Sequence, residues 1–480
     1  MTPARLVLPA LRWRPETAFA HEDRAIDAAL ALGVGGFIVF GVGGARSDEI
    51  ARLTEEVRVR AGRPLLIGAD LERGAGQQAR RSTEIPPPRA LASLDDEGVI
   101  AWAGATTARE ARRMGVNWVF APDADLDLEP LNPIVQTRSF GDDPQRVGRA
   151  VAAWITAAQR EGVLACAKHF PGHGRTRHDS HQVLPEVHCS LEELGRTDLR
   201  PFEHAIAAGV ASVMTAHVAF PSWDHQRLPA TQSATILGHL RERMGYDGLV
   251  VTDALVMEGA KGGAAEAKAV VRAIRAGCDL LLYPGDAAVA AAALAHAAGA
   301  DPEMDQRIAA SLARYERALT TATTPRGATG GAPMALSAEA VADRLLERGL
   351  LRGTAPELVG GVTLEVVDDD VGGWYAPGPS DRVLRSLARW KVYERPEGRR
   401  IVLAFAEPRA AKGRAGFGPE SRARLADLVP EAALVVLFAH PRLAAEIPGS
   451  CPVLCAWHRQ PLMQEAVARW LRKQLVPVAA

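Results

Sequence analysis

The sequence of 480 residues predicts an α/β fold in two parts. Short apolar runs alternate with longer amphipathic segments, rich in Ala and Arg, from residue 5 to about 285, which is the pattern of strands that are each followed by a helix. Eight such runs occur, and the alternation returns near the C-terminus. Eight strand and helix pairs of this total length predict a (β/α)8 TIM barrel, followed by a smaller open α/β sandwich domain.

The predicted barrel strands are, in chain order, RLVLPAL, GGFIVFG, PLLIGAD, VNWVFAP, GVLACAKH, ASVMTAHV, GLVVTDA and DLLLYPG. Helical segments follow the eighth strand, and TATTPRGATGGAPMA then indicates a linker because of its small residues, Pro and Gly. Beyond it, VTLEVVDDD, RRIVLAFAEP, AALVVLFAHP and CPVLCAW predict a second, mainly parallel sheet with helices between its strands. We therefore expect a catalytic barrel over residues 1–321, a linker over 322–336 and the smaller domain over 337–480.

The composition argues against several classes of partner. Lys and Arg number 56 and Asp and Glu 57, so the net charge of -1 provides no long-range field to gather nucleic acid or an anionic membrane. Five scattered cysteines are too few for a disulfide framework and fit a reducing compartment. The N-terminus lacks a signal-like apolar run, and no window approaches the roughly 18 apolar residues that span a bilayer. We expect a cytoplasmic protein that acts on a small or neutral molecule.

Ionisable residues close several of the predicted barrel strands. Asp70, Lys168 with His169, His217 and Asp253 each end an apolar run. In a (β/α)8 barrel the carboxyl ends of the strands meet at one face, which carries the active site. Strands that are merely structural more often run out into Gly, Pro or Asn, so these ends favour a shared site.

The stretch AKHFPGHGRTRHDSHQ, residues 167–182, contains four histidines beside Asp179. His169 and His173 have the i, i+4 spacing of a helical zinc site, but Pro171 and the neighbouring glycines forbid a helix, which leaves a loop metal site as a minor alternative. A catalytic loop is the second interpretation, because the carboxylate of Asp179 can hydrogen-bond one ring nitrogen of His181 and leave the other to exchange a proton. A solvated polar loop is the plain alternative.

The motif KHFPGHG, residues 168–174, followed by Asp179, Ser180 and His181, resembles the signature of family 3 glycoside hydrolases, in particular their β-N-acetylglucosaminidase branch. Further segments resemble that family in the same order, namely NPIVQTRSFGDDP, AGVASVMTAHVAFP, PATQSATILGHLRERMGYDGLVVTDAL and AIRAGCDLLLYPG. The resemblance covers about residues 5 to 320 and, more weakly, the tail. It implies the same two-part fold and no cofactor.

The resemblance also implies roles for individual residues. Asp253 matches the family nucleophile, His181 the general acid/base and Asp179 its orienting partner. The matches to groups that bind the hydroxyls of the sugar are Asp70, Arg138, Lys168 and His169, and His217 is a further candidate contact. A retaining glycosidase needs an anionic nucleophile and a proton donor at the leaving oxygen, which suits these residue types. Without the resemblance, Asp253 could equally cap the next helix.

The chain departs from the family pattern in two places. The position of a second sugar-binding Arg falls on Gln78, so that contact is lost or supplied by Arg73 or Arg80. Arg175, Arg177 and His178 add charge to the loop before Asp179, with no evident family counterpart. We expect His173 to pack the loop, and Trp102 and Trp118 to lie in the core because of their apolar neighbours.

These observations predict a retaining exo-β-N-acetylglucosaminidase that needs no metal and acts on a carbohydrate with a terminal β-linked N-acetylglucosamine, as in peptidoglycan recycling. Two alternatives stay open. A phosphorylase of the same family would use phosphate in place of water, and a neutral His would not repel it. A non-catalytic relative would bind glycans only. The aglycone and the oligomeric state do not follow from the sequence.

Overall fold

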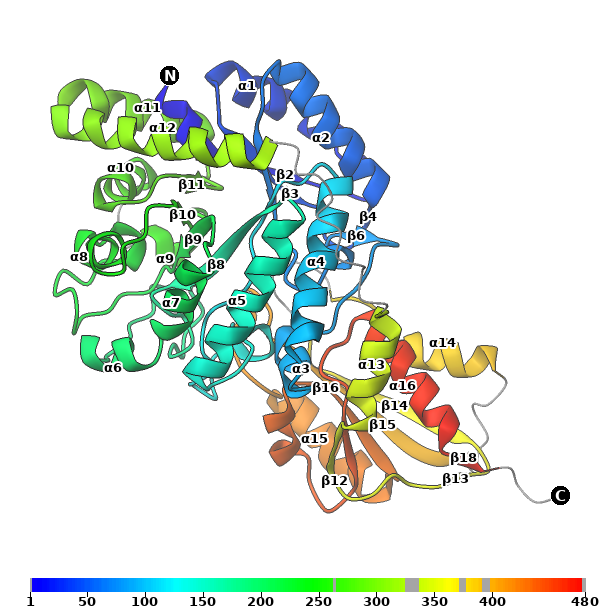
Figure 1. Cartoon of the computed structure of the whole chain (residues 1–480). Coiled ribbons are helices and arrows are strands. Elements are labelled where there is room, and N and C mark those ends of the chain that lie inside the picture. Colours follow the sequence, from blue (N-terminus) through cyan, green and yellow to red (C-terminus); the bar gives the residue numbers. More distant parts are fainter. Residues whose placement is uncertain (1, 262–264, 324–335, 371–376, 391–397, 477–480) are drawn as a thin grey trace. The chain divides into compact units, whose positions relative to one another are not determined.

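Figure 1 shows the computed structural model, which describes residues 2–261, 265–323, 336–370, 377–390 and 398–476. The chain forms two compact units. The first unit comprises Met1–Thr83, Ile100–Glu129 and Ser139–Pro333, and the second comprises Glu84–Val99, Pro130–Arg138 and Met334–Ala480. Two short segments that we had expected in the barrel thus group with the second unit. The predicted boundaries stay a prediction, and residues 324–335 of the predicted linker lie outside the described residues.

A parallel barrel forms the centre of the first unit. Its main sheet has the order β10-β9-β8-β7-β5-β3-β2. The strands are β2 (Ala10–Arg12), β3 (Gly36–Phe40), β5 (Leu66–Ala69), β7 (Trp118–Val119), β8 (Leu164–Phe170), β9 (Ser212–Thr215) and β10 (Leu249–Thr252). Each coincides with one of the predicted apolar runs to within one residue at its end, so this part of the fold prediction is confirmed.

A short seam closes the barrel. β1 (Val7–Leu8) pairs in parallel with β11 (Leu281–Leu282), and a bridge between Val251 and Leu280 joins β10 to the start of β11. Because β1 is separated from β2 only by Pro9, these pairs connect the two edges of the main sheet. The first and eighth predicted strands therefore meet, as a (β/α)8 barrel requires.

Helices follow the strands of the barrel (Figure 1). The longer ones are α1 (Asp23–Leu32), α2 (Ser47–Ala61), α4 (Glu97–Arg113), α5 (Pro144–Arg160), α7 (Arg200–Ala207), α10 (Glu266–Ala276), α11 (Ala287–Ala300) and α12 (Pro302–Thr323). Shorter ones are η1 (Pro3–Leu6), η2 (Ala20–Glu22), η3 (Ala75–Gln77), α6 (Leu191–Arg196), η5 (Ala230–Gln232), α8 (Ala234–Gly238), η6 (His239–Arg243) and α9 (Glu258–Lys261). A small parallel pair, β4 (Ala45–Arg46) and β6 (Ala79–Arg80), lies outside the barrel sheet.

Helix α5 illustrates why these segments are helical. The side chain of Asp143 accepts a hydrogen bond from the backbone N–H of Arg146, and Pro144 occupies the first turn, where a missing N–H costs nothing. The buried residues Val147, Val151 and Trp154 recur at a spacing of three to four residues, which places them on one face. The sequence pattern thus fixes both the start of the helix and the face that packs on the barrel.

Aromatic side chains fill part of the barrel core. Trp118 is fully buried and its ring N–H donates to the Ser212 hydroxyl at 2.7 Å. A side-chain carbon on Gly68 would lie 2.5 Å from the Phe120 ring, so any larger residue at this strand position would have to displace that ring. Trp102 is also buried. The prediction that Trp102 and Trp118 are core residues is confirmed.

The second unit contains a five-stranded sheet of the order β12-β17-β16-β15-β14. β14 (Val362–Asp368), β15 (Arg399–Ala406), β16 (Leu434–Ala439) and β17 (Val453–Cys455) are parallel, and β12 (Leu350–Arg352) is antiparallel at the edge. The other elements of this unit are α3 (Pro88–Ser93), η4 (Gln136–Arg138), α13 (Ala338–Glu347), β13 (Leu358–Val359), α14 (Arg382–Arg389), α15 (Pro419–Leu428), η7 (Val429–Glu431), η8 (Pro441–Glu446), α16 (Pro461–Lys473) and β18 (Leu475–Val476). The predicted open, mainly parallel sheet is confirmed.

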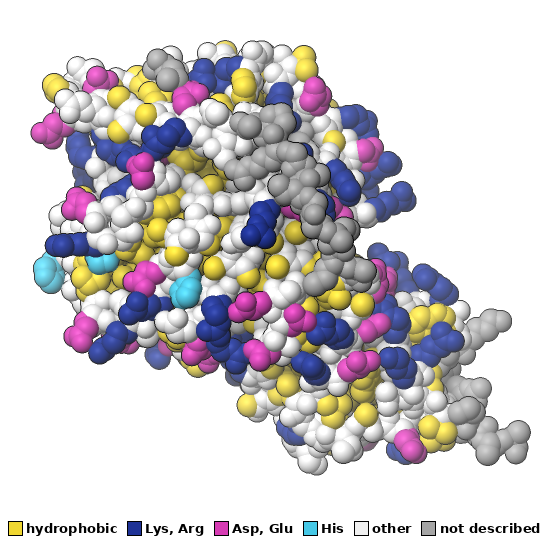
Figure 2. Space-filling model, viewed as in Figure 1, with side chains coloured by type: hydrophobic (Ala, Val, Ile, Leu, Met, Phe, Trp, Pro, Cys, Tyr) yellow, Lys and Arg dark blue, Asp and Glu magenta, His cyan; other side chains and the backbone are white. Residues whose placement is uncertain are grey.

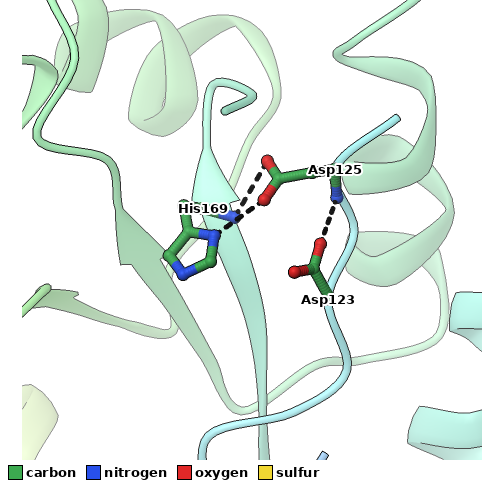
Figure 3. A group of neighbouring side chains, drawn as sticks. All are labelled: Asp123, Asp125 and His169. Carbon is green, nitrogen blue, oxygen red and sulfur yellow. Dashed lines mark hydrogen bonds and ion pairs between the residues drawn. The ribbon is translucent and has the colours of Figure 1, made fainter. Parts of the chain in front are cut away.

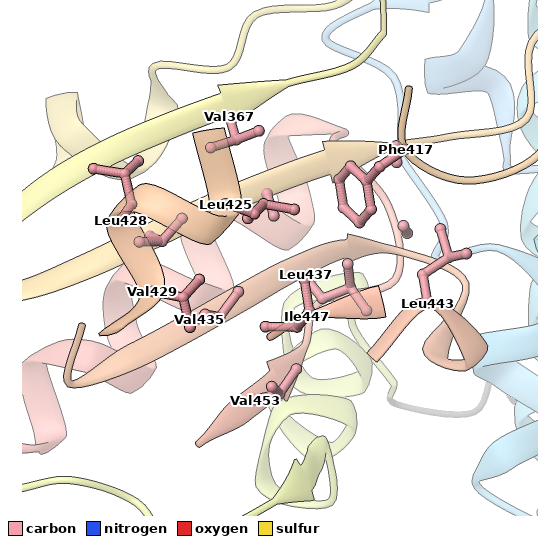
Figure 4. Close-up of a cluster of buried hydrophobic side chains, with 14 residues drawn as sticks. Val367, Phe417, Leu425, Leu428, Val429, Val435, Leu437, Leu443, Ile447 and Val453 are labelled. Carbon is pink, nitrogen blue, oxygen red and sulfur yellow. The ribbon is translucent and has the colours of Figure 1, made fainter. Parts of the chain in front are cut away.

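One face of this sheet has its own apolar core. Figure 4 shows Val367, Val435 and Leu437 from the strands packed with Phe417 and Leu425. All of these side chains are buried. A separate core of this size allows the second unit to be stabilised by its own hydrophobic contacts.

The surface and the cysteines agree with the composition. On the face shown in Figure 2, Lys and Arg side chains are interspersed with Asp and Glu. The five cysteines are free thiols. None of the described helices combines the length and apolar character that a bilayer crossing requires. The cytoplasmic location stays a prediction.

Candidate active site

Polar side chains gather at the carboxyl ends of the barrel strands, as the sequence predicts. Asp70 follows β5, Lys168 and His169 lie near the end of β8, His217 follows β9 and Asp253 follows β10. Contacts between charged groups join Lys168 to Asp70 and His169 to Asp253. The site is therefore built from residues far apart in the sequence on neighbouring strands.

Lys168 is clamped between two carboxylates. Its Nζ lies 2.9 Å from Oδ1 of Asp70 and 2.6 Å from Oε1 of Glu72, and its side chain is only 3% exposed. Glu72 is nearly as buried, whereas the side chain of Asp70 is 28% exposed. Asp70 is thus the member of this group that can reach a ligand with a charged acceptor, and Lys168 fixes its direction.

His169 is held by Asp125, a residue that our sequence analysis did not select (Figure 3). Nδ1 of His169 lies 2.7 Å from Oδ2 of Asp125, and because a carboxylate only accepts, Nδ1 carries the proton. Oδ1 of Asp125 accepts the backbone N–H groups of His169 and His173 at 3.2 and 2.6 Å. Asp125 therefore orients the ring and secures the backbone on either side of Pro171.

Asp123, Asp125 and His169 place ligand-type atoms within 4.8 Å of one another (Figure 3). Oδ1 of Asp123 accepts the backbone N–H of Asp125 at 2.9 Å. Since hydrogen bonds within the chain already use both carboxylate oxygens of Asp125, these contacts explain the cluster as the support of His169.

Asp253 directly follows β10, and its carboxylate lies between the backbone N–H of Ala254 and the imidazole of His169. Its Oδ1 accepts the N–H of Ala254 at 2.7 Å, and its Oδ2 lies 3.9 Å from Nε2 of His169. Burial raises the pKa of this carboxyl, but His169, His217 and the Ala254 N–H outweigh that effect and lower the pKa to about 2. The side chain is 20% exposed. Asp253 is thus an accessible carboxylate anion throughout the neutral and mildly acidic range.

The loop after β8 brings Asp179 and His181 together. Oδ1 of Asp179 lies 2.7 Å from Nδ1 of His181 and also accepts the backbone N–H of His181 at 2.9 Å. The Asp179 side chain is fully buried, whereas that of His181 is 17% exposed. His181 is among the groups that lower the pKa of Asp253, so it lies within electrostatic reach of that carboxylate. The pairing expected from the D-x-H spacing is present, and the catalytic roles stay a prediction.

His173 fixes the shape of this loop. Its Nδ1 lies 3.0 Å from the Thr176 hydroxyl and its Nε2 lies 2.8 Å from the Ser180 hydroxyl. The residue is buried. With both ring nitrogens bonded within the loop, His173 is a packing residue and not a metal ligand. Gly174 is required beside it, because a side-chain carbon there would lie 1.5 Å from the carbonyl oxygen of Leu126.

Arg175 anchors the loop to α6 and the turn that follows it. Its Nε donates to Oδ2 of the buried Asp198 at 2.8 Å, and its Nη1 lies 2.8 Å from Oε1 of Glu193. Thr197 accepts from Nη2 at 3.1 Å. Burial lowers the pKa of the Arg175 guanidinium, but Asp198 outweighs it and the pKa is raised. Arg177, by contrast, is 67% exposed and pairs with Glu129 on the surface.

His217 is completely buried beneath Asp253. Its Nε2 lies 3.2 Å from the Ala254 carbonyl and its Nδ1 lies 2.8 Å from the Thr231 hydroxyl. Burial lowers the pKa of this ring, and Asp253 opposes the shift. Because both nitrogens contact the protein, the geometry favours a role in holding the backbone beside Asp253. Its predicted contact with substrate stays a prediction.

Gln78 is an internal brace. Its Oε1 accepts the backbone N–H groups of Gly41 and Val42 at 2.9 and 3.0 Å, and its Nε2 donates to the carbonyl of Asp70 at 3.2 Å. The residue is buried. The position that carries a sugar-binding Arg in the family is therefore used here to tie the loop after β3 to the loop after β5.

Arg138, the remaining predicted substrate contact, belongs to the second unit. It ends the short helix η4, and its Nη1 donates to the Ile134 carbonyl at 3.3 Å. Its role toward substrate stays a prediction. Sequence analysis missed Asp125, Glu72 and Asp198 as supports, although Asp125 carried a signal, because it lies three residues beyond the end of the predicted strand VNWVFAP.

The site combines the ionised carboxylate of Asp253 after β10, the Asp179–His181 pair on the loop after β8, and polar side chains between them. Glycoside hydrolases with a barrel fold use sites of this kind. Residues 14–318 match the family model described as "Glycosyl hydrolase family 3 N terminal domain", and the chain belongs to this family. The family expected from the KHFPGHG and D-x-H motifs is thus confirmed.

Individual relatives agree. The chain is 38% identical over 230 residues to a "Beta-N-acetylglucosaminidase/beta-glucosidase" of Cellulomonas fimi, which covers 46% of this chain and 41% of that protein. It is 37% identical over 257 residues to a "Beta-hexosaminidase" of Thiobacillus denitrificans, which covers 52% of this chain and 71% of the relative. The structure resembles a family 3 β-N-acetylglucosaminidase from Paenibacillus sp. str. FPU-7, with a TM-score of 0.81, 26% identity and coverage of 99% and 96%.

Proposed function

We propose that this protein is a retaining exo-β-N-acetylglucosaminidase with Asp253 as nucleophile and His181 as general acid/base. The observation that carries the proposal is the carboxylate of Asp253, which is ionised, partly exposed and within electrostatic reach of a His that Asp179 orients. A retaining glycosidase requires one group that attacks the anomeric carbon and one that gives up a proton. The names of the relatives support the N-acetylglucosaminyl specificity.

In the first step, one oxygen of Asp253 forms a bond to the anomeric carbon of the terminal sugar. The bond between that carbon and the glycosidic oxygen breaks, and its electron pair stays on the oxygen, which takes a proton from Nε2 of His181. The aglycone leaves as a neutral alcohol. His181 is neutral after this step, and its Nδ1 keeps its proton, which it donates in a hydrogen bond to Asp179.

In the second step, Nε2 of His181 accepts a proton from water as the water oxygen attacks the anomeric carbon. The bond between that carbon and Asp253 breaks, and the carboxylate regains its charge. Asp253 is well suited to leave, because a carboxyl with a pKa of about 2 is a stable anion at neutral pH. The sugar is released with its original anomeric configuration.

The polar groups around the carboxylate support substrate binding. Asp70 is exposed enough to accept hydrogen bonds from sugar hydroxyls, with Lys168 holding it in place. His169 lies beside Asp253 with its Nε2 toward the carboxylate. We propose these three residues and Arg138 as contacts of the sugar, with His217 behind them. The free thiols support a cytoplasmic enzyme, and the interspersed charges on the face in Figure 2 support action independent of nucleic acid and membrane. We propose cell-wall fragments as its substrates because they carry terminal N-acetylglucosamine.

The test is hydrolysis of p-nitrophenyl N-acetyl-β-glucosaminide and p-nitrophenyl β-glucoside, with and without inorganic phosphate. We expect a preference for the N-acetyl sugar, and Asp253→Asn should reduce kcat by about 10³-fold or more. His181→Gln, given an aryl glycoside with a very good leaving group, should accumulate a protein whose mass is increased by one N-acetylhexosaminyl residue. That adduct should be absent from the double variant with Asp253→Asn.

Other outcomes select the alternatives. Release of sugar 1-phosphate, with acceleration by phosphate, would identify a phosphorylase. Loss of activity on treatment with a chelator would identify a metal hydrolase. A folded protein that binds N-acetylglucosamine and cleaves none of these glycosides would be a glycan-binding relative.

A further inference from the structure

A pocket lies in the first unit at the end of the barrel opposite to the candidate active site. It is bounded by the amino ends of β8, β9 and β10 and by the C-terminal half of α12, and its volume is about 340 Å³. This volume is in the range of small-molecule sites. The proposed hydrolysis at the carboxyl ends of the strands makes no use of it.

Two arginines reach the pocket from one face of α12. Arg314 and Arg317 are three residues apart, and both donate to Asp247, with Nε of Arg314 and Nη2 of Arg317 each 3.0 Å from a carboxylate oxygen. The side chain of Asp247 is 75% exposed. Ion pairs with so exposed a carboxylate contribute about 1 kcal/mol or less, so Asp247 occupies the two guanidinium groups only weakly.

The charges that surround the arginines do not balance. Nη1 of Arg314 also lies 3.5 Å from Oδ1 of the buried Asp279. Asp279 is shared with two further arginines, Arg241 and Arg307. Among the described residues, these ion pairs thus join four guanidinium groups to two carboxylates, which leaves an excess of two positive charges. Burial lowers the pKa of Arg241, and Arg314 and Arg307 lower it further while Asp279 opposes them, which is the sign of crowded cations.

The floor of the pocket is backbone. Gly162, Gly209 and Gly248 line it, each shortly before a barrel strand, and Val163 and Leu249 add apolar surface. A ligand body can therefore rest on peptide groups and aliphatic carbon while its charged end meets the arginines. An arginine fork matches phosphate oxygens in geometry, and a phosphate monoester carries close to two negative charges at neutral pH.

We propose that this pocket binds a small organic phosphate, with the phosphate on Arg314 and Arg317 in place of the Asp247 carboxylate and the organic part on the glycine floor. Once the Asp247 carboxylate is displaced, a dianion compensates the positive charge of the four guanidinium groups better than a monocarboxylate would. This inference does not depend on the proposed hydrolysis, because the two sites lie at opposite ends of the strands.

The test is isothermal titration of the full chain with glycerol 3-phosphate and glucose 6-phosphate, with glycerol and glucose as uncharged controls. Arg317→Gln, at an exposed position, should raise the Kd about tenfold or more, because a charge-assisted hydrogen bond is lost. Asp247→Asn should lower the Kd by a similar factor, because the competing carboxylate is removed. Arg52→Gln, which breaks another exposed ion pair, with Asp48, is the matched control and should leave the Kd unchanged.

Opposite results would overturn the proposal. One such result is a Kd that neither Arg317→Gln nor Asp247→Asn changes. Others are no binding at millimolar concentration of the organic phosphates, or equally tight binding of the uncharged controls. If Asp253→Asn weakens binding and Arg317→Gln does not, the phosphate binds at the candidate active site, and the proposal is overturned as well. Binding that follows the pocket variants in a protein with no glycosidase activity would support this site and refute only the proposed function.

Discussion

A single oxygen of Asp179 holds both the ring and the backbone of His181, at 2.7 Å from Nδ1 and 2.9 Å from the peptide nitrogen. Because both contacts converge on Oδ1, the orientation of the ring is tied to the fold of the loop. The charge and the geometry of this support can be separated by mutation. An asparagine keeps an accepting oxygen at the same place, whereas an alanine removes it.

We therefore expect Asp179→Asn to keep the loop fold and to lower kcat by about 10²-fold, because a neutral amide stabilises the imidazolium less than a carboxylate does. Asp179→Ala should cost more. The loss should be large for a substrate with a poor leaving group and small for dinitrophenyl N-acetyl-β-glucosaminide, which needs little protonation. Equal losses on both substrates would contradict the role of the pair in acid catalysis.

Arg175 should matter for turnover although it lies four residues before Asp179. Arg175→Ala leaves the buried carboxylate of Asp198 without its guanidinium, so we expect the free energy of unfolding to fall by about 2–3 kcal/mol and kcat to fall about tenfold with KM little changed. Arg175→Lys should recover part of kcat. Arg177→Ala removes an exposed pair and is the control, with a change in stability below about 0.5 kcal/mol. Similar kinetics for Arg175→Ala and Arg177→Ala would refute the anchor.

The buried ring of His217 makes stability depend on pH. Burial lowers its pKa below the unfolded value of about 6.5, so below that pH the unfolded state binds a proton that the folded state does not. Stability therefore rises with pH through this range and falls as the pH drops below about 6.5, by up to about 1.4 kcal/mol per pH unit. The midpoint of urea unfolding should be measured between about pH 5 and 8, which brackets the titration. Plotted against pH, it should rise less steeply in His217→Gln than in the wild type. Parallel slopes in the two proteins would exclude His217 as the source.

Gln78 should prove structural and not substrate-binding. Gln78→Ala leaves the backbone N–H groups of Gly41 and Val42 without their acceptor, so we expect a loss of about 1–3 kcal/mol in the free energy of unfolding. Gln77→Ala, which removes one partly buried contact to Arg73, should cost less. Thermal unfolding checks the stability, and KM of the folded fraction checks the substrate contact. A higher KM at unchanged stability would show that Gln78 touches the sugar.

The barrel could be predicted from the sequence because its strands are short, apolar and separated by helical segments. The periodicity of apolar residues and the turn-forming residues between the segments are sufficient to locate these elements. Lys168 and His169 lie near the carboxyl end of β8 and Asp253 directly follows β10, as the barrel prediction implies. The pairing of Asp179 with His181 is equally local, since the two residues are two positions apart. These features depend on neighbours in the chain and need no knowledge of the tertiary contacts.

What the sequence did not reveal depends on distant partners. Asp125 meets His169 across 44 positions, and Lys168 reaches back 98 positions to Asp70. Gln78 resembled a lost contact because a family pattern records the residue type and not what its side chain bonds. The grouping of Arg138 with the second unit is likewise set by contacts and not by its place between two barrel strands.

The seam between β1 and β11 has a consequence for synthesis on the ribosome. Val7 pairs with Leu281, so the edge of the sheet near the N-terminus has no partner until almost three hundred residues have left the exit tunnel. Until then the nascent chain presents an open, curled sheet with apolar strands at its margin.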